Sequence, residues 1–109
     1  MKIISIDFDG VIHNPNDRAP GYKMGKPFHG ARDSILVMKR KGWKVIISSA
    51  RAIESQRPYI CQWLSYFGIP YDEVTNIKPV ADYYIDDKAI EFKDWNQTMV
   101  SIQNKEEGI

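Results

Sequence analysis

A run of isoleucines near the N-terminus ends in two carboxylates and a glycine, within residues 3–11 (IISIDFDGV). Closely spaced β-branched residues are typical of a strand that is buried on both faces of a sheet. Ligands of open α/β sheets bind outside the carboxyl ends of the strands, which would place Asp7 and Asp9 at the binding edge. Gly10 would let the backbone turn sharply and lie close to a ligand. The alternative is an ordinary turn, because Asp-Gly is a strong hairpin signal.

Two later segments repeat this pattern of an apolar strand that ends in polar side chains. Residues 43–49 (WKVIISS) end in two serines, and residues 81–87 (ADYYIDD) end in two aspartates. A shorter and weaker strand is predicted at 71–75. Because the carboxyl ends of parallel strands meet at one edge of a sheet, polar groups from separate segments would converge there. We expect this edge to collect Asp7, Asp9, Ser49, Asp86 and Asp87.

Helical periodicity separates the predicted strands. Residues 30–41 form one apolar stripe ended by Gly42, and residues 55–67 form a second that ends at Gly68. One helix between consecutive strands favours right-handed β-α-β units and parallel pairing. A further amphipathic helix is predicted from Trp95 to about residue 102, covering a face of the sheet. The chain is thus predicted to be a single domain, residues 1–109, with a three-layer α/β/α, Rossmann-like, doubly wound parallel sheet.

Composition excludes several functional classes. Fifteen basic and 14 acidic residues leave a formal charge of +1, so no bias towards polyanions favours a nucleic-acid partner. The single Cys61 cannot form an intramolecular disulfide. The sequence shows neither a signal-like N-terminus nor an apolar stretch long enough to cross a bilayer. We therefore expect a cytoplasmic protein without a membrane partner, for which a homo-oligomer is compatible with the sequence.

Residues 11–29 are rich in turn-forming residues and predict a loop over the binding edge. The loop carries several basic or titratable side chains that would be available to an anionic substrate, although surface lysines are usually only solvated. These side chains are His13, Lys23, Lys26 and His29.

Carboxylates gathered at one edge repel one another unless a cation neutralises them, and oxygen ligands suit a hard ion such as Mg²⁺. A hydroxyl from Ser49 and the ammonium of Lys78 beside such an ion would make a site for a phosphate group. The same residues also have simpler interpretations. Asp86 and Asp87 could cap a short helix, and Lys78 could be an ordinary surface lysine.

Four segments, in order, resemble the motifs of the haloacid dehalogenase superfamily of Asp-nucleophile phosphohydrolases. The segment 7–11 resembles the first motif, Ser49 fits the second, Lys78 fits the third, and 86–87 fits the acidic fourth. The resemblance spans residues 3–90. A hydroxyl after a strand and a lone lysine are weak signals by themselves, so the order and spacing of the segments carry most of the resemblance.

The resemblance implies that Asp7 is the nucleophile, which becomes an aspartyl phosphate. Asp9 would protonate the leaving alcohol and then accept a proton from water, while its backbone carbonyl binds the metal. Asp86 would hold Mg²⁺ together with Asp7, and Asp87 would bind the metal directly or through water.

The phosphoryl group would be held by Ser49 and Lys78, with Gly10 allowing close approach to the backbone. Ser48 competes with Ser49 for the hydroxyl role. Arg51 would either bind substrate or pair with an acid.

Members of this superfamily commonly carry a cap domain, for which neither residues 11–29 nor residues 52–77 leave room. The resemblance therefore implies a capless, Mg²⁺-dependent phosphomonoesterase with an open site. Its phosphorylated substrate would be a bulky small molecule, the end of a macromolecule, or a small substrate enclosed by a neighbouring subunit. Two alternatives stay open: a noncatalytic module that binds a phosphorylated ligand, and a phosphotransferase with an acceptor other than water.

Overall fold

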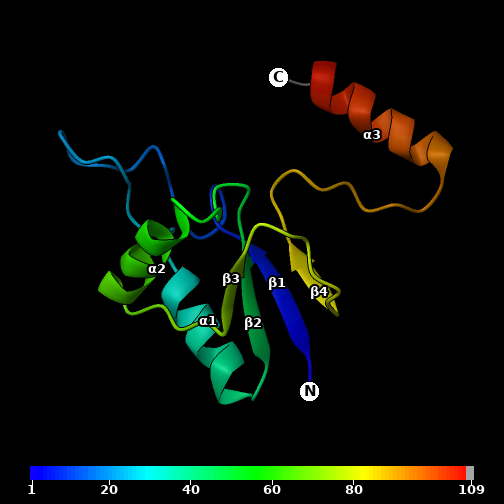
Figure 1. Cartoon of the computed structure of the whole chain (residues 1–109). Coiled ribbons are helices and arrows are strands. Elements are labelled where there is room, and N and C mark those ends of the chain that lie inside the picture. The colour runs from blue at the N-terminus through cyan, green and yellow to red at the C-terminus, as the bar shows by residue number, and fades with distance from the viewer. Residues whose placement is uncertain (108–109) are drawn as a thin grey trace.

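The computed structural model describes residues 1–107 of the chain and contains four strands and three helices (Figure 1). In chain order these are β1 (Ile3–Asp7), α1 (Ala31–Arg40), β2 (Lys44–Ser48), α2 (Arg57–Tyr66), β3 (Glu73–Thr75), β4 (Tyr83–Ile85) and α3 (Trp95–Glu107). The predicted strands and the two crossover helices are therefore present, and their ends lie within a few residues of the expected positions.

The four strands form one parallel sheet in the order β3-β2-β1-β4. In its register Asp7 lies beside Ser48, and Ser48 lies beside Thr75. Ile6 pairs with Ile85, so the residues that follow β1 and β4 emerge side by side. The prediction of a parallel α/β sheet is confirmed. The Asp-Gly segment does form a turn after β1, but this turn joins no hairpin, because β1 pairs only with parallel strands.

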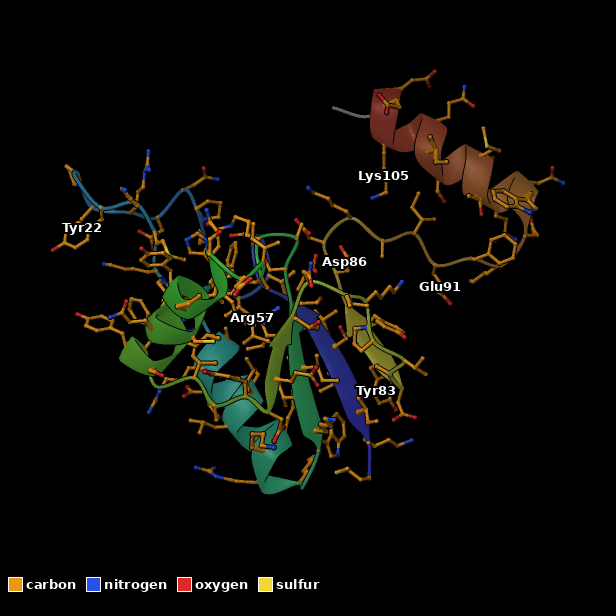
Figure 2. The ribbon with its side chains drawn as sticks, viewed as in Figure 1. Tyr22, Arg57, Tyr83, Asp86, Glu91 and Lys105 are labelled. Carbon is orange, nitrogen blue, oxygen red and sulfur yellow. The ribbon has the colours of Figure 1, made fainter. Side chains whose placement is uncertain are left out.

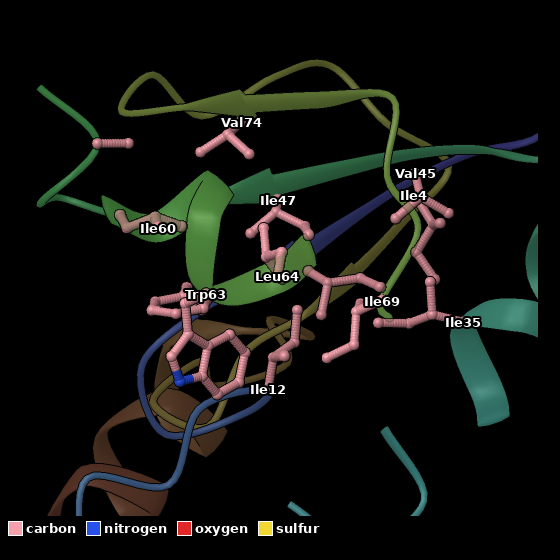
Figure 3. Packing of buried hydrophobic residues seen from close by; sticks show 13 residues of the cluster. Ile4, Ile12, Ile35, Val45, Ile47, Ile60, Trp63, Leu64, Ile69 and Val74 are labelled. Atoms are coloured by element: carbon pink, nitrogen blue, oxygen red, sulfur yellow. The ribbon is translucent and has the colours of Figure 1, made fainter. Parts of the chain in front are cut away.

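The hydrophobic core lies between one face of the sheet and the helices α1 and α2 (Figure 3). Alternate residues of the strands point to this face, and α1 and α2 contribute apolar side chains from the other side. Full burial of an isoleucine or leucine side chain contributes roughly 1.5–3 kcal/mol, so this layer anchors the two central strands. The main contributors are Ile4, Ile6, Ile35, Val45, Ile47, Ile60, Leu64 and Val74.

The last helix departs from the prediction of three layers. Helix α3 packs against none of the other helices or strands and stands apart from the sheet (Figure 1). The expectation that the tail helix covers a sheet face is therefore wrong for residues 95–107. Helix α3 stands apart because the preceding segment, residues 86–94, contains no helix or strand and leads away from the core. Within residues 1–107, helices cover one face of the sheet only.

No helix in the described part of the chain has the length and apolarity that crossing a membrane requires.

Candidate active site

Three carboxylates meet where β1 and β4 end. Asp7 is the last residue of β1, and Asp86 and Asp87 follow β4 directly, with Asp86 labelled in Figure 2. One carboxylate oxygen of each residue lies within 4.8 Å of one oxygen of each of the others. The pairing of Ile6 with Ile85 causes this proximity, because it brings the next residues of both strands side by side. We call this group the acid cluster.

The acid cluster is electrostatically strained in the absence of a cation. Burial raises the pKa of Asp7 above its usual value, and the neighbouring charge of Asp86 and then of Asp87 adds to this rise. A hydrogen bond from the Ser48 hydroxyl to Oδ1 of Asp7, 3.3 Å long, acts in the opposite direction. The three neighbouring carboxylates provide the oxygen donors that a hard divalent cation prefers. The residues present therefore fit Mg²⁺.

Gly10 allows the loop after β1 to lie against the acid cluster. It adopts φ +85°, a left-handed conformation that residues with a side chain rarely take. A Cβ atom placed on Gly10 would lie 2.6 Å from Oδ2 of Asp87. The turn thus favours glycine here, and any larger residue would make the Asp87 carboxylate shift.

Asp9 lies outside the acid cluster and binds two other side chains. Arg51 donates to it twice, from Nε to Oδ2 at 2.9 Å and from Nη2 to Oδ1 at 2.7 Å, and Nδ1 of His13 lies 2.8 Å from Oδ1. Burial alone would raise the pKa of Asp9, but the hydrogen bonds from Arg51 and His13 outweigh it and lower the pKa. Arg51 was expected either to bind substrate or to pair with an acid, and in the structure it pairs with Asp9.

His13 connects Asp9 to the loop and was not predicted to do so. The residue is 3% exposed, and its ring stacks on Phe8 with ring centres 5.2 Å apart. Nε2 of His13 accepts the backbone N–H of Gly25 at 2.8 Å, so Nδ1 carries the proton and donates to Asp9. Trp63 donates from Nε1 to the carbonyl of Gly25 at 2.9 Å. From the sequence, His13 was one of several loop side chains that could contact an anionic substrate, but its ring is buried and both ring nitrogens have partners within the protein. The i, i+4 spacing from Asp9 was the only sequence signal of these contacts.

A cavity of about 190 Å³ opens between the carboxyl ends of β1, β2 and β4. Both candidate serines line it and differ in their contacts. Ser48 contacts Asp7, whereas the Ser49 hydroxyl accepts the backbone N–H of Arg51 at 3.1 Å. Lys78 also lines the cavity, with its ammonium 4.7 Å from the ring centre of Tyr84. Asp7, Asp86, Ser49 and Lys78 are thus brought together, and their individual roles stay predictions.

The loop of residues 11–29 contains no helix or strand, and residues 52–77 hold only α2 and β3. A larger groove of about 580 Å³ lies between this loop and α2, away from the acid cluster, and Lys26 and Trp63 line it. Lys23 and His29 line neither this groove nor the smaller cavity. No further domain stands over the strand ends in the described residues.

The fold and site define an open, parallel α/β protein with an acidic cluster at its strand ends. No protein-family model matches the chain. No curated protein matches its sequence.

Among solved structures, the chain is similar to a conserved protein from Bacteroides thetaiotaomicron. The TM-score is 0.64 at 21% identity, over 95% of this chain and 91% of that one. It is also similar to a D,D-heptose 1,7-bisphosphate phosphatase from B. bronchiseptica, whose structure contains magnesium and phosphate. That TM-score is 0.49 at 15% identity, over 100% of this chain and 65% of that one. At these identities the likeness concerns the fold.

Proposed function

We propose that the protein is a Mg²⁺-dependent phosphomonoester hydrolase that acts through an aspartyl-phosphate intermediate. The observation that carries this proposal is the acid cluster of Asp7, Asp86 and Asp87, set beside a small cavity that Ser49 and Lys78 also line. Three carboxylates held this close together favour a bound cation, and a cation, an ammonium and a hydroxyl together suit a phosphoryl group.

In this proposal the Asp7 carboxylate attacks phosphorus, and the bond from phosphorus to the leaving oxygen breaks. Asp9 gives its proton to that oxygen, and then takes a proton from the water that hydrolyses the acyl phosphate, which restores both carboxyl groups. Ser49 and Lys78 would hold the phosphoryl oxygens. Bound Mg²⁺, held by Asp7 and Asp86 with Asp87 direct or through water, would supply positive charge against the phosphoryl group.

Arg51 would change partners during this cycle. The free protein holds Asp9 as a carboxylate, because Arg51 and His13 lower its pKa, whereas a general acid must carry a proton. If Arg51 turned to the phosphoryl oxygens of a bound substrate, Asp9 would lose two hydrogen bonds to its charged form and its pKa would rise. Substrate binding would thereby help to prepare the acid.

The cavity at the strand ends is smaller than a typical small-molecule pocket. Its volume of about 190 Å³ compares with roughly 300–1,000 Å³ for sites that enclose a ligand. It suits a phosphoryl group, while the remainder of the substrate would lie outside. We therefore favour a bulky phosphate ester or a phosphorylated macromolecule end, and the charge of +1 gives no support to a polynucleotide.

The test is hydrolysis of p-nitrophenyl phosphate with and without Mg²⁺. We expect Asp7→Asn to reduce the rate to the level of the uncatalysed reaction, and chelation of the metal to do the same for the parent. Asp33→Asn is the matched control, because Asp33 is an exposed residue of α1 outside the site. Parent-like turnover by the Asp7→Asn protein, or turnover that chelation leaves unchanged, would contradict the proposal.

One observation favours the noncatalytic alternative, a module that binds a phosphorylated ligand. The two-point hold of Arg51 on Asp9 leaves the proposed acid ionised in the free protein. Release of inorganic phosphate together with a trapped acyl phosphate on Asp7 would exclude that alternative. Product analysis with added alcohols or sugars would separate hydrolysis from phosphoryl transfer to another acceptor.

A further inference from the structure

Helix α3 carries an apolar stripe that no other helix or strand of the described chain covers, and the ring of Phe92 lies edge-on 5.4 Å from that of Trp95. Trp95, Met99 and Ile102 follow i, i+4, i+7 spacing and so lie on one side of the helix. Trp95 is 70% and Met99 is 58% exposed, and α3 packs against no other element. A single helix of about 12–15 residues is only marginally stable in water without packing partners. The stripe therefore indicates a docking face.

An apolar surface of matching kind lies on the helix-bearing face of the sheet at β4. Tyr83 and Ile85 pair in register with Ile4 and Ile6, which point into the core, so their side chains share that face. Both are partly exposed, because α1 and α2 pack over β2 and β3 and do not reach β4. Trp43 stacks on Tyr83 with ring centres 5.8 Å apart. We call Trp43, Tyr83 and Ile85 the β4 patch.

The unpaired edge of β4 adds a second reason for a cover. In the sheet of residues 1–85, β4 pairs only with β1, and its outer edge offers free backbone groups. Proteins usually protect such an edge with a helix, a loop or charged side chains, because an open edge pairs with other chains. All three residues of β4 are exposed and none is charged. A helix laid along β4 would cover this strand.

The length of α3 suits the β4 patch. Thirteen helical residues rise about 20 Å, and the five residues of the neighbouring strand β1 span about 17 Å. The stripe of α3 can therefore follow the sheet from one end of the strands to the other.

The charges at the two ends also match. Lys2 lies 5.8 Å from the ring centre of Tyr83, and Lys41 lies 5.6 Å from that of Trp43, so the amino-terminal end of the β4 patch is basic. The last turn of α3 carries Lys105, Glu106 and Glu107, so acids outnumber bases at this end by one. A helix with Trp95 near Ile85 and its acidic end near the lysines would satisfy both the apolar and the charged contacts.

We propose that α3 of one copy of this chain docks on the β4 patch of a second copy, and that the exchange is reciprocal. The helix leads away from its own sheet through residues 86–94, so its stripe does not reach its own patch in this structure (Figures 1 and 2). A second copy supplies both missing surfaces at once. Because the exchange is reciprocal, with each copy giving its helix to the other's patch, the assembly closes as a two-fold dimer. This inference does not depend on the proposed function.

The first experiment measures the mass of the full chain in solution by sedimentation over a range of concentrations. We expect a dimer for the parent, and a monomer for Met99→Asp and for Tyr83→Asp, because either change places a charge in the apolar contact. Asn104→Asp is the matched control: it adds the same charge on the opposite side of α3 and should leave the dimer intact. Circular dichroism would show that each variant is folded. A folded parent that is monomeric throughout the range would overturn the proposal.

The second experiment separates exchange between copies from folding back within one copy. In a Cys61→Ser background, one chain carries Tyr83→Cys and a second, tagged chain carries Met99→Cys. We expect oxidation of the mixture to link the tagged chain to the untagged one. A chain with both substitutions that links only internally, while the mixture stays unlinked, would show that α3 folds back on its own patch, and the proposal would be wrong.

Discussion

Arg51 holds Asp9 in a two-point contact, with both carboxylate oxygens accepting from the guanidinium, at 2.9 and 2.7 Å. Such bidentate pairs combine strong hydrogen bonds with a fixed geometry. Asp9 comes from the turn after β1 and Arg51 from the turn after β2, so the contact ties together two adjacent strand ends. It also fixes the charge of the side chain that would have to carry the proton in the proposed reaction.

The first prediction concerns the titration of Asp9. We expect its midpoint in the free protein to lie below the usual value for aspartate, and to rise in Arg51→Met, which keeps an unbranched side chain but donates no hydrogen bond. The carboxyl carbon chemical shift of Asp9, followed by NMR over a range of pH, would give the midpoint in the parent and in Arg51→Met. Arg18→Met is the control, because Arg18 is an exposed loop residue with no contact to Asp9, and it should leave the midpoint unchanged. An Asp9 midpoint above the usual range in the parent would contradict the prediction.

The same shift has a consequence for acid stability. A carboxyl whose pKa is lower in the folded state stabilises the fold above its unfolded pKa, which is about 3.9, and this contribution disappears as the pH falls through the folded pKa. We therefore expect acidification over this interval to destabilise the parent more than Arg51→Met. Because Asp9 and Arg51 are both about two-fifths exposed, the difference should be small. Urea unfolding at a series of pH values would measure it.

The second prediction separates the two contacts of His13. Asn at this position can still donate to Asp9 but does not reach Gly25, whereas Gln can accept from Gly25 and does not reproduce the contact with Asp9. Both should lose roughly 1–3 kcal/mol of stability, because the buried ring and one hydrogen bond disappear. If His13 positions Asp9, His13→Asn should retain a higher kcat than His13→Gln at temperatures where both are folded.

Comparison of kcat and KM in the two variants would test this positioning role. If His13 has only a structural role, kcat in the two variants should follow their stability alone, whichever contact is kept. Equal kcat in two folded variants, or a higher kcat in His13→Gln, would show that the contact with Asp9 has no part in the reaction.

The parallel sheet and the meeting of Asp7 with Asp86 and Asp87 could be predicted from sequence, because each depends on a local pattern, whereas the strand order was not predicted. Apolar runs that alternate with helical segments favour a parallel sheet, and parallel strands bring their carboxyl ends to one edge. Besides these local patterns, the prediction needed only the order of the segments along the chain. Periodicity within each segment therefore determined most of the fold.

The partners of Asp9 could not be predicted in this way. His13 and Arg51 reach the same carboxylate from two different loops, and loop geometry leaves no periodic signal. The position of α3 was missed for a related reason. Its apolar stripe indicates that the helix packs against something, but a sequence pattern does not say whether the partner surface belongs to the same chain.

The third prediction uses two glycines that share a backbone conformation. Gly10 and Gly21 have φ +85° and +87°, but a Cβ on Gly21 would meet no atom within 4 Å, whereas on Gly10 it would collide with Asp87. Both alanine variants should lose about 1–2 kcal/mol from the left-handed conformation. Only Gly10→Ala should also disturb the acid cluster.

Titration with Mg²⁺, followed by the rise in melting temperature, would show that difference. We expect Gly10→Ala to need more Mg²⁺ than Gly21→Ala for the same rise, because Asp87 must move. If the two variants respond to Mg²⁺ alike, the approach of Gly10 to Asp87 does not shape the metal site.

The fourth prediction assigns different roles to the two serines. The Ser48 hydroxyl lowers the pKa of Asp7, so Ser48→Ala should raise that pKa further. The attacking Asp7 must be ionised, and the acidic limb of the kcat/KM profile should therefore move to higher pH. Ser49 has no contact with Asp7, and Ser49→Ala should instead raise KM and weaken inhibition by inorganic phosphate, roughly 10-fold or more, through loss of a hydrogen bond to a charged group. If Ser48→Ala raised KM without moving the profile, Ser48 would hold the phosphoryl group in place of Ser49.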